Sequence, residues 1–383
     1  MGDAVRVAVV HDWLESWRGG ERVLAEILRL YPQADLFALV DFLSDADRKA
    51  LLGKRATTSF IQNMPFAESS FRLWLPLFPR AIESLDLSSY ELVISSSHAV
   101  AKGVMTHRRQ VHICYCFTPM RYAWDLREQY LRQTGFDRGL RGLLVRPVLT
   151  RLRAWDRAAS ARVDHFIAIS RHIADRIRRC YGRDSTVIYP PVAVAPDANF
   201  GPRGDHYVTV SQLVPYKRID LIVQAFARLP EHRLVIVGDG PERRRIEATA
   251  TPNVRFLGRL PERERDQWLA TARAFIFAAE EDFGIAPLEA QALGTPVIAY
   301  AGGASSETIV GNEGDTPTGI LYREQTSTAI VEALREFERS ASRIRPEACR
   351  ENARRFDVHR FRRDLLAFVD ARAPGAVRLM LSP

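Results

Sequence analysis

The sequence predicts an α/β protein made of two doubly wound, parallel-sheet domains. Three observations lead to this prediction: a length of 383 residues, a composition of 46% hydrophobic and 26% charged residues, and short apolar runs that alternate with amphipathic stretches. At roughly 150 residues per domain, this length accommodates two or three domains, each with its own core. The composition excludes disordered, fibrous and membrane-embedded proteins. Strands that alternate with helices pair in parallel, and helices cover both faces of such a sheet.

Six apolar runs in the first half of the chain predict strands. They span residues 5–10, 36–40, 92–95, 111–116, 165–168 and 187–189. A helix is predicted over residues 21–30. The segment 190–204 is rich in Pro and Gly and has no apolar periodicity, which is typical of an interdomain linker. We therefore assign residues 1–195 to an N-terminal Rossmann-like domain.

The same alternation restarts after the linker. The predicted strands span residues 207–210, 234–237, 254–257, 274–277 and 297–299. Between the first two, an apolar stripe at helical spacing predicts a helix with one buried face; its members are Ile219, Ile222, Val223, Phe226 and Leu229. We assign residues 196–360 to a C-terminal Rossmann-like domain and residues 361–383 to a tail helix that packs back toward the N-terminal domain.

Charge and apolar patterning leave several partners open. The net charge of +8 favours anionic ligands without distinguishing among them. Residues 121–162 carry ten arginines and predict basic amphipathic helices; the interleaved apolar residues are Leu143, Leu144, Val145, Val148, Leu149 and Leu152. Such a segment either docks on an anionic membrane surface or forms a solvated helix pair. The cluster around Phe71, Trp74 and Phe78 either joins the core or faces lipid. No aromatic-interleaved recognition motif indicates nucleic-acid binding.

Hydropathy and cysteine usage predict the cellular location. No apolar run approaches the roughly 18 residues of a membrane span, and the run 7–10 is too short for the core of a signal peptide. The four cysteines contain no C-x-x-C pair, so we expect reduced thiols that pack in the interior. We expect a cytoplasmic protein, peripheral at the inner face of the plasma membrane.

Ligands of open α/β sheets bind beyond the carboxyl ends of the strands, so the loops after the strands carry the candidate site. His11 and Asp12 follow the first predicted strand. Gly19 and Gly20 precede the predicted helix, where their backbone amides could approach a phosphate. His98 follows the third predicted strand.

Two segments of the second domain are more specific. Lys217 and Arg218 lie between the first strand and the following helix, where a point charge and a planar guanidinium suit a diphosphate. Glu281 and Glu289 lie eight residues apart, across a strand-to-helix connection. One carboxylate could accept sugar hydroxyls and the other ribose hydroxyls. Between them lie residues whose backbone could meet phosphate at the helix start: Phe283, Gly284, Ile285 and Ala286.

Several motifs occur together in the order seen in one known family. They are Glu281-x7-Glu289 with Phe283-Gly284 inside it, and the segments 237–241 (VGDGP), 256–258 (FLG), 11–13 (HDW), 95–103 (SSSHAVAKG), 118–125 (TPMRYAWD) and 214–218 (VPYKR). The chain resembles the retaining glycosyltransferases of family 4 with the GT-B fold. Within them it is similar to bacterial mannosyltransferases of surface-polysaccharide assembly. The resemblance runs almost end to end and implies a central crevice between two Rossmann-like domains.

The resemblance implies roles for individual residues. Glu281 would contact the donor sugar, Glu289 the ribose and Lys217 the diphosphate, with the backbone near Phe256 bordering the base. The N-terminal domain would hold the acceptor. We place on the acceptor side the residues His11, Asp12, Phe117, Arg121 and Tyr122.

Two positions depart from the pattern of the family. Relatives usually carry Arg where this chain has Gln212, so one diphosphate cation is absent or is supplied by Arg218. Relatives of this branch usually carry His at the position of Phe117, where it contacts the donor sugar, and a phenyl ring makes no such hydrogen bond. His98 or His11 could compensate. We take Glu281, Lys217 and His98 as the catalytic set.

These features predict a retaining, metal-independent hexosyltransferase that uses GDP-mannose, needs no cofactor and extends a polyprenyl-diphosphate-linked glycan in exopolysaccharide or O-antigen synthesis. Asp45-x-Asp47 is interpreted as a helix start rather than a metal site, because carboxylates are favoured there. Three competing hypotheses are a transferase that uses another donor such as a UDP-sugar, a nucleotide-sugar epimerase on the same fold, and a degenerate, non-catalytic homologue.

Overall fold

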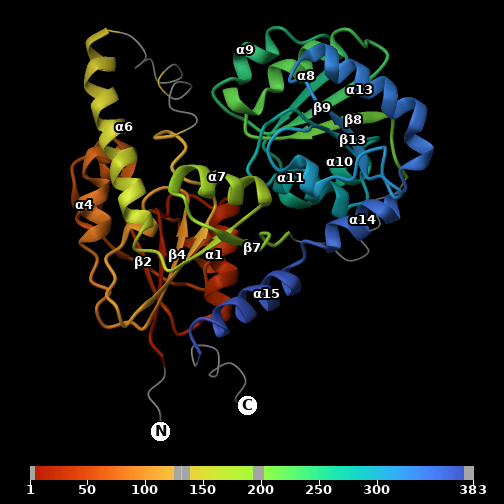
Figure 1. Ribbon diagram of the computed structural model, residues 1–383. Coiled ribbons are helices and arrows are strands. Elements are labelled where there is room, and N and C mark those ends of the chain that lie inside the picture. Colours follow the sequence, from red (N-terminus) through yellow and green to blue (C-terminus); the bar gives the residue numbers. More distant parts are fainter. Residues whose placement is uncertain (1–4, 125–130, 132–138, 193–201, 375–383) are drawn as a thin grey trace. The chain divides into compact units, whose positions relative to one another are not determined.

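The structure is a computed structural model that describes residues 5–124, 131, 139–192 and 202–374, with the side chains of 139–144 left out. Most of the predicted linker lies outside these residues. So does nearly all of the part of the basic segment 121–162 that spans residues 125–138. The chain divides into two compact units (Figure 1). Unit 1 comprises Met1–Pro190 and Phe361–Pro383, and unit 2 comprises Pro191–Arg360.

Unit 1 contains a seven-stranded, fully parallel sheet in the order β3-β2-β1-β4-β5-β6-β7. Its strands are β1 (Val7–His11), β2 (Asp35–Ala38), β3 (Thr57–Thr58), β4 (Leu92–Ser97), β5 (Val111–Cys116), β6 (His165–Ala168) and β7 (Ser185–Val187). The six predicted strands are confirmed, with β7 beginning and ending two residues earlier than predicted. The edge strand β3 was not predicted, because two polar threonines carry no apolar signal.

Most helical elements of unit 1 connect these strands, whereas α15 comes from the far end of the chain and enters unit 1 at Phe361. They are α1 (Gly19–Leu30), α2 (Asp45–Ala50), η1 (Phe60–Asn63), α3 (Ala67–Ser70), η2 (Phe71–Leu77), α4 (Phe78–Glu83), η3 (Ala101–Gly103), α6 (Gly139–Ser160), α7 (Arg171–Tyr181) and α15 (Val358–Asp370). Helix α1 begins two residues before the predicted start, because the Glu21 carboxylate accepts the backbone N–H of Arg18 at 2.9 Å and caps the helix there. Asp45 and Asp47 lie in the first turn of α2, where Ser44 caps the helix.

Helix α15 packs on unit 1 from the far end of the chain. The ring of Phe361 meets that of Tyr115 in β5 edge-on, with ring centroids 5.8 Å apart. Arg362 donates to Glu26 of α1 at 2.8 Å. The described part of the predicted 361–383 tail is therefore helical to Asp370 and belongs to unit 1.

The apolar side chains of the basic segment belong largely to the core of unit 1. Leu149 and Leu152 of α6 are buried in the same cluster as Phe71 and Phe78, whose rings stack with centroids 6.1 Å apart. Trp155 donates to Glu83 of α4 at 2.8 Å, and Figure 1 shows the two helices side by side. Of the two interpretations of the Phe71 cluster, core packing is confirmed for both phenylalanines. Among the side chains of α6 that the structure describes, from residue 145 on, the exposed charges are Arg151, Arg153 and Arg157.

Unit 2 contains a six-stranded parallel sheet in the order β10-β9-β8-β11-β12-β13. Its strands are β8 (His206–Val210), β9 (Arg233–Val237), β10 (Val254–Gly258), β11 (Phe275–Phe277), β12 (Val297–Tyr300) and β13 (Gly319–Tyr322). The five predicted strands are confirmed. Strand β13 was not predicted, and its first residue must be glycine, because a Cβ on Gly319 would lie 1.9 Å from the carbonyl oxygen of Val297.

Helices cover both faces of this sheet, as the alternation predicts. The helical elements are η4 (Pro215–Lys217), α8 (Ile219–Phe226), α9 (Arg243–Glu247), α10 (Glu262–Ala270), α11 (Ile285–Ala292), α12 (Ser305–Thr308), α13 (Ser327–Ser340), η5 (Ala341–Arg343) and α14 (Pro346–Arg354). One buried cluster lies under α8 and α13, and a second under α10 and α11 (Figure 1). All five members of the predicted helical stripe are buried in the first cluster.

The cysteines and the helices also bear on the sequence predictions. Cys114, Cys116, Cys180 and Cys349 are all buried free thiols. Among the helices that the structure describes, none has the length and apolar character needed to cross a bilayer.

Candidate active site

The predicted charges of unit 2 meet at one point of its sheet. Lys217 follows β8 and Glu281 follows β11, and these strands are neighbours at the position where the strand order reverses. Such a switch point is where open α/β sheets bind ligands. The Nζ of Lys217 forms an ion pair with Oε1 of Glu281. The two side chains are 18% and 17% exposed, so both are largely withdrawn from water but remain within reach of a ligand.

A glycine of the next loop fixes the backbone of Glu281. Gly303 forms an isolated parallel bridge with Glu281, and Ala304 donates to the Glu281 carbonyl oxygen at 2.9 Å. Gly303 has φ of +66°, and a Cβ there would lie 2.1 Å from the same oxygen. The positive φ favours glycine, and the close approach of the Glu281 carbonyl oxygen requires it. This contact was not predicted, although Gly302-Gly303 after a predicted strand was a usable signal.

Two further glycines lock the loops after β8 and β9 together. A Cβ on Gly238 would lie 1.8 Å from the carbonyl oxygen of Ser211, and one on Gly240 would lie 2.3 Å from that of Leu213. Gly238 also donates to the carbonyl oxygen of Gly258 at the end of β10, at 2.7 Å. The close approach of the Ser211 and Leu213 carbonyl oxygens explains why the VGDGP segment needs its glycines. Gln212 is exposed on the loop that they hold.

Arg218 is held at the start of α8 in a left-handed conformation, with φ of +53°. Its guanidinium donates to Asp220 and to Gln325, each at 3.3 Å. Gln325 in turn donates to the carbonyl oxygen of Ala278, after β11, at 2.8 Å. Arg218, the predicted second cation, is therefore next to Lys217 in sequence. Through Gln325 it is also connected to the same edge of the sheet, and Asp220 offsets part of its charge.

Helix α11 begins where the sequence places it. Gly284 is the N-cap residue with φ of +83°, and Ile285 and Ala286 occupy the first turn, half-buried. Phe283 is buried and packs its ring on Phe356, with centroids 5.7 Å apart, so its side chain belongs to the core. A contact of Phe283 with a ligand would therefore come from its backbone.

Glu289 lies within α11 and is half-buried. Burial alone would lower the pKa of Arg265 on α10. The nearby carboxylates of Glu289, Asp266 and Glu262 outweigh this effect and hold the pKa of Arg265 above its ordinary value. This partner was not predicted, because α10 and α11 become neighbours only in the folded unit. Phe256 of β10 is half-buried and packs against the core cluster under α8.

In unit 1, Asp12 organises the loop after β4. Its Oδ2 accepts the backbone N–H groups of His98 at 2.5 Å and Ala99 at 3.0 Å. Its Oδ1 accepts those of Val100 and Ala101, each at 2.6 Å. The side chain is completely buried. Burial alone would raise the pKa of Asp12, but the adjacent His98 and His11 and the loop amides hold it well below its ordinary value.

A ring cluster surrounds this carboxylate. Nδ1 of His98 lies 2.9 Å from Oδ2 of Asp12. The His98 ring meets Trp13 edge-on at a centroid distance of 4.5 Å, and Phe117 and His11 lie at 6.4 and 6.3 Å. His11 ends β1, Asp12 and Trp13 follow it, and His98 follows β4, which adjoins β1 at the switch point of this sheet; Phe117 follows the next strand, β5.

His11 is enclosed by the protein. Its Nδ1 lies 3.1 Å from the Ser96 hydroxyl, and its Nε2 lies 3.7 Å from Oε1 of Glu21, a buried acid that was not among the predicted site residues. Gly20, in the first turn of α1 with Gly19, packs beside His11 and Phe117, where a Cβ would make ordinary contacts at 3.8 Å. Arg121 and Tyr122 are half-buried in the turn after β5.

The structure thus brings Lys217 and Glu281 together at the switch point of the unit 2 sheet, and His11, Asp12 and His98 at that of the unit 1 sheet. Phe256 lies apart from the first pair, on the edge strand β10. Within the described residues, no group of three or more His, Cys, Asp or Glu side chains is arranged to hold a metal ion.

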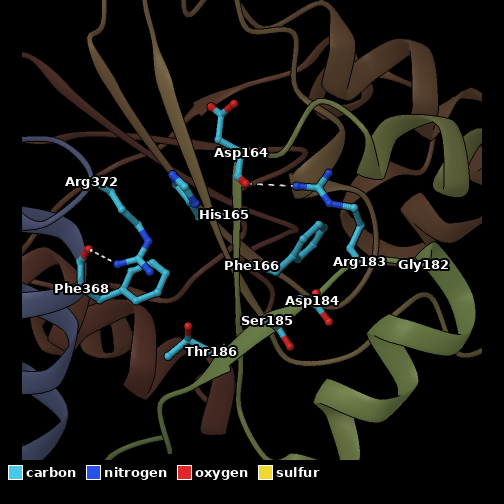
Figure 2. Close-up of a pocket in the computed structure, with 10 residues that line it drawn as sticks. All are labelled: Asp164, His165, Phe166, Gly182, Arg183, Asp184, Ser185, Thr186, Phe368 and Arg372. Atoms are coloured by element: carbon cyan, nitrogen blue, oxygen red, sulfur yellow. Dashed lines mark hydrogen bonds between the residues drawn. The ribbon is translucent and has the colours of Figure 1, made fainter.

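A separate pocket of about 440 Å³ lies at the other end of the unit 1 sheet. Figure 2 shows its lining, which comes from the start of β6, from the turn before β7 and β7 itself, and from Phe368 of α15 and Arg372 just after that helix. Arg183 there donates to the carbonyl oxygens of Val163 and Asp164, and Arg372 to that of Phe368. These arginines therefore serve local structure, and the pocket contains none of the predicted residues.

Comparison with sequence families covers most of the chain. The family described as Glycosyltransferase Family 4 matches residues 17–195, and the family described as Glycosyl transferases group 1 matches residues 199–356. The GDP-mannose-dependent monoacylated alpha-(1-6)-phosphatidylinositol monomannoside mannosyltransferase of Corynebacterium glutamicum is 37% identical over 143 residues, which cover 33% of this chain and 36% of that protein. The D-inositol 3-phosphate glycosyltransferase of Mycobacteroides abscessus is 34% identical over 170 residues, covering 41% and 37%. These alignments span about a third of the length of the curated relatives.

Solved structures match both units. Sucrose-phosphate synthase from Thermosynechococcus elongatus superposes with a TM-score of 0.70 at 18% identity, over 96% of this chain and 98% of that one. Anabaena HepE in complex with UDP and glucose superposes with a TM-score of 0.67 at 18% identity, over 95% and 99%.

Proposed function

Since the chain belongs to glycosyltransferase family 4 and has the two parallel-sheet α/β domains of the GT-B architecture, we propose that it is a retaining, metal-independent, GDP-mannose-dependent α-mannosyltransferase. The observation that carries the proposal is the ion pair of Lys217 and Glu281 at the switch point of unit 2. A cation and a carboxylate side by side complement the two ends of the reacting bond, which joins a diphosphate to a sugar.

In the proposed reaction, the bond between the anomeric carbon and the diphosphate oxygen breaks while the acceptor hydroxyl attacks from the same face. The hydroxyl proton passes to the departing phosphate oxygen, and the configuration is retained. Lys217, Arg218 and the first turn of α11 stabilise the charge that grows on the diphosphate. Glu281 accepts hydrogen bonds from the sugar hydroxyls. Catalysis is then mostly positioning and electrostatic stabilisation.

The donor assignment is supported by the relatives. The Corynebacterium protein is described as GDP-mannose-dependent, and the Anabaena structure holds UDP and glucose. Both therefore point to a nucleotide-sugar, and the higher sequence identity of the first favours GDP-mannose. A UDP-sugar is the second candidate.

We further propose that the acceptor is a polyprenyl-diphosphate-linked glycan and that the enzyme works at the cytoplasmic face of an anionic membrane, in exopolysaccharide or O-antigen synthesis. Exposed arginines of α6 and the exposed side chains of Phe66 and Leu73 support membrane contact. Sedimentation with phosphatidylglycerol vesicles tests it. Binding that vanishes in neutral vesicles is expected, and equal absence of binding to both vesicle types contradicts it.

Thermal denaturation with a panel of GDP- and UDP-sugars tests the donor. A ligand at about 100 times its Kd stabilises the folded state by about 2.7 kcal/mol, which raises the melting temperature by several degrees. GDP-mannose is expected to give the largest shift. A shift with UDP-sugars and none with GDP-mannose would overturn the donor assignment and leave the family unchanged.

Product analysis distinguishes glycosyl transfer from epimerisation and from a loss of catalysis. An epimerase would release an epimerised nucleotide-sugar without any acceptor, whereas the proposed transferase forms a glycoside only when acceptor is present. A degenerate homologue would show no turnover with any donor, and the variant Phe117→His would not restore it.

A further inference from the structure

We infer that the pocket beside β6, β7 and α15 is a binding site for a small phosphate ester, which Arg183 and Arg372 hold. The inference goes beyond the proposed function, because this pocket lies at the amino ends of the strands and the candidate active site of unit 1 lies beyond their carboxyl ends. Every residue that lines the pocket belongs to unit 1. The site is therefore complete within one unit.

Carbonyl oxygens and aromatic rings hold both arginines in place. Arg183 donates to three carbonyl oxygens between the end of α6 and the start of β6, at 2.7 to 3.0 Å, and its Cζ lies 5.5 Å from the centre of the Phe166 ring. Arg372 donates to the carbonyl oxygen of Phe368 at 3.0 Å, and its Cζ lies 3.5 Å from the centre of that ring. Among the residues that the structure describes, neither guanidinium forms an ion pair. Each is thus oriented in advance and keeps N–H donors for a ligand.

The two carboxylates that line the pocket are engaged with other groups. Oδ1 of Asp184 accepts from Nη2 of Arg178 at 2.7 Å. Oδ2 of Asp164 accepts the backbone N–H of His112 at 2.8 Å. Figure 2 shows that Asp164 meets Arg183 through its carbonyl oxygen. The positive charge of the pocket therefore remains available to an anion.

His165 senses this positive charge. Figure 2 shows its ring between the two arginines, and the ring meets that of Phe368 edge-on with centroids 6.3 Å apart. Burial and the charges of Arg372 and Arg183 lower the pKa of His165 below its ordinary value. Asp164 acts in the opposite direction without cancelling this effect. The imidazole is therefore neutral at pH 7 and has one N–H to donate to an anion.

Charge and size select the class of ligand. A phosphate monoester carries about 1.5 to 2 negative charges at pH 7, which two guanidinium groups balance, and a planar guanidinium donates two N–H groups to a phosphate. The volume of about 440 Å³ lies within the roughly 300–1,000 Å³ of small-molecule sites and exceeds the need of inorganic phosphate.

Hydroxyl groups in the lining favour a polar ester such as a sugar phosphate. Ser185 and Thr186 both line the pocket. The Ser185 Oγ is buried and has no hydrogen-bond partner in the part of the chain that the structure describes. A hydroxyl in this state gains free energy when a ligand supplies a partner.

The first test measures affinity. Glucose 6-phosphate is titrated calorimetrically into the full chain that carries Lys217→Ala, so that the proposed diphosphate site of unit 2 is weakened. We expect saturable binding that becomes at least about ten-fold weaker when Arg372→Gln is added. Arg335→Gln, at an exposed position of α13, is the matched control and should leave the affinity unchanged.

Two further titrations separate the sources of the same chemistry. Inorganic phosphate is expected to bind more weakly than glucose 6-phosphate, and glucose is expected not to bind. Absence of ester binding, or equal affinity with and without Arg372→Gln, overturns the inference. Equal affinity for inorganic phosphate overturns the assignment to an ester.

The second test locates the ligand. A molecule bound to both Arg183 and Arg372 connects the turn before β7 to α15, so it should hold that helix on unit 1. Saturating glucose 6-phosphate is expected to slow hydrogen exchange in peptides that cover residues 361–374. It should also shift the ring signal of His165, which is identified by its loss in His165→Gln. Unchanged exchange together with an unchanged His165 signal contradicts the inference. Failure of GDP-mannose to bind the wild type would instead refute the proposed function and leave this site standing.

Discussion

The two switch points use charge in opposite ways. Unit 1 contains three completely buried charged groups, Asp12, Lys102 and Asp156. These groups form their hydrogen bonds and ion pairs with other groups of the protein. In unit 2, Lys217 and Glu281 form a pair that is still partly exposed. Unit 1 therefore uses charge to fix a loop that presents an imidazole, while unit 2 keeps charge available to a ligand. This difference favours the proposed assignment of the anionic diphosphate to unit 2.

The largest effect should come from breaking the buried charge pair of unit 1. Lys102→Met leaves Asp156 without its cation in a site that water does not reach, at a cost of about 3–5 kcal/mol in the free energy of unfolding. Arg178→Met, in the exposed pair with Asp184, should cost at most about 1 kcal/mol. Calorimetric melting of both variants checks the contrast. Equal melting temperatures would show that burial does not distinguish the two pairs.

Loss of the partly exposed carboxylate of unit 2 should affect turnover instead of stability. Glu281→Gln keeps the size of the side chain but removes the charge that pairs with Lys217. We expect a loss of transfer of about 10²–10³-fold, as for removal of one transition-state contact, with little change in melting temperature. Glu332→Gln, at an exposed position of α13, is the control. Activity within three-fold of wild type at about equal donor concentrations would contradict the role of Glu281.

A smaller effect should come from the glycine that supports Glu281. Gly303→Ala introduces left-handed strain of about 1–2 kcal/mol and also a collision with the Glu281 carbonyl oxygen. Gly182→Ala carries the same strain, with φ of +67°, but meets no atom within 4 Å. Urea denaturation should show the greater loss for Gly303→Ala, together with reduced transfer. If the two variants lose the same free energy and both keep full activity, the support of Glu281 by Gly303 is not needed.

The smallest effect should be a pH dependence of stability. The pKa of Asp12 is held below its ordinary value in the folded protein, although burial opposes this. The stabilisation is therefore complete above the unfolded pKa of about 3.9 and is lost as the pH falls toward the folded pKa. Urea midpoints of wild type should fall between about pH 4 and 2, and Asp12→Asn should show a shallower slope. Parallel slopes would indicate that Asp12 is not held in its charged form.

Most of the fold could be predicted because strands buried on both faces read as short apolar runs. Strand β3, with only Thr57 and Thr58, lacks that signal, whereas strand β13 carries it in Ile320–Tyr322 and was missed. The proximity of Lys217 and Glu281 could also be predicted from the sequence, because both residues follow strands and the carboxyl ends of parallel strands lie at one edge of a sheet.

The contacts that fix the loops of the candidate site could not be predicted from the sequence pattern. The amide nest around Asp12 and the approach of Gly303 to Glu281 depend on loop conformations, which carry no periodicity. Asp12 was expected on the acceptor side, but its side chain is completely buried and accepts four backbone N–H groups of the loop after β4. Arg265 meets Glu289 only through the packing of two helices.

The central claim is that the carboxyl edge of unit 2 grips the diphosphate of a nucleotide-sugar through Lys217. The most direct measurement is the Kd of GDP-mannose, by calorimetric titration, for wild type, Lys217→Ala and the exposed-arginine control Arg335→Ala. We predict binding at least about ten-fold weaker for Lys217→Ala, equivalent to about 1.4 kcal/mol, and no change for Arg335→Ala. Equal affinity of Lys217→Ala and wild type for a donor that binds both would contradict it.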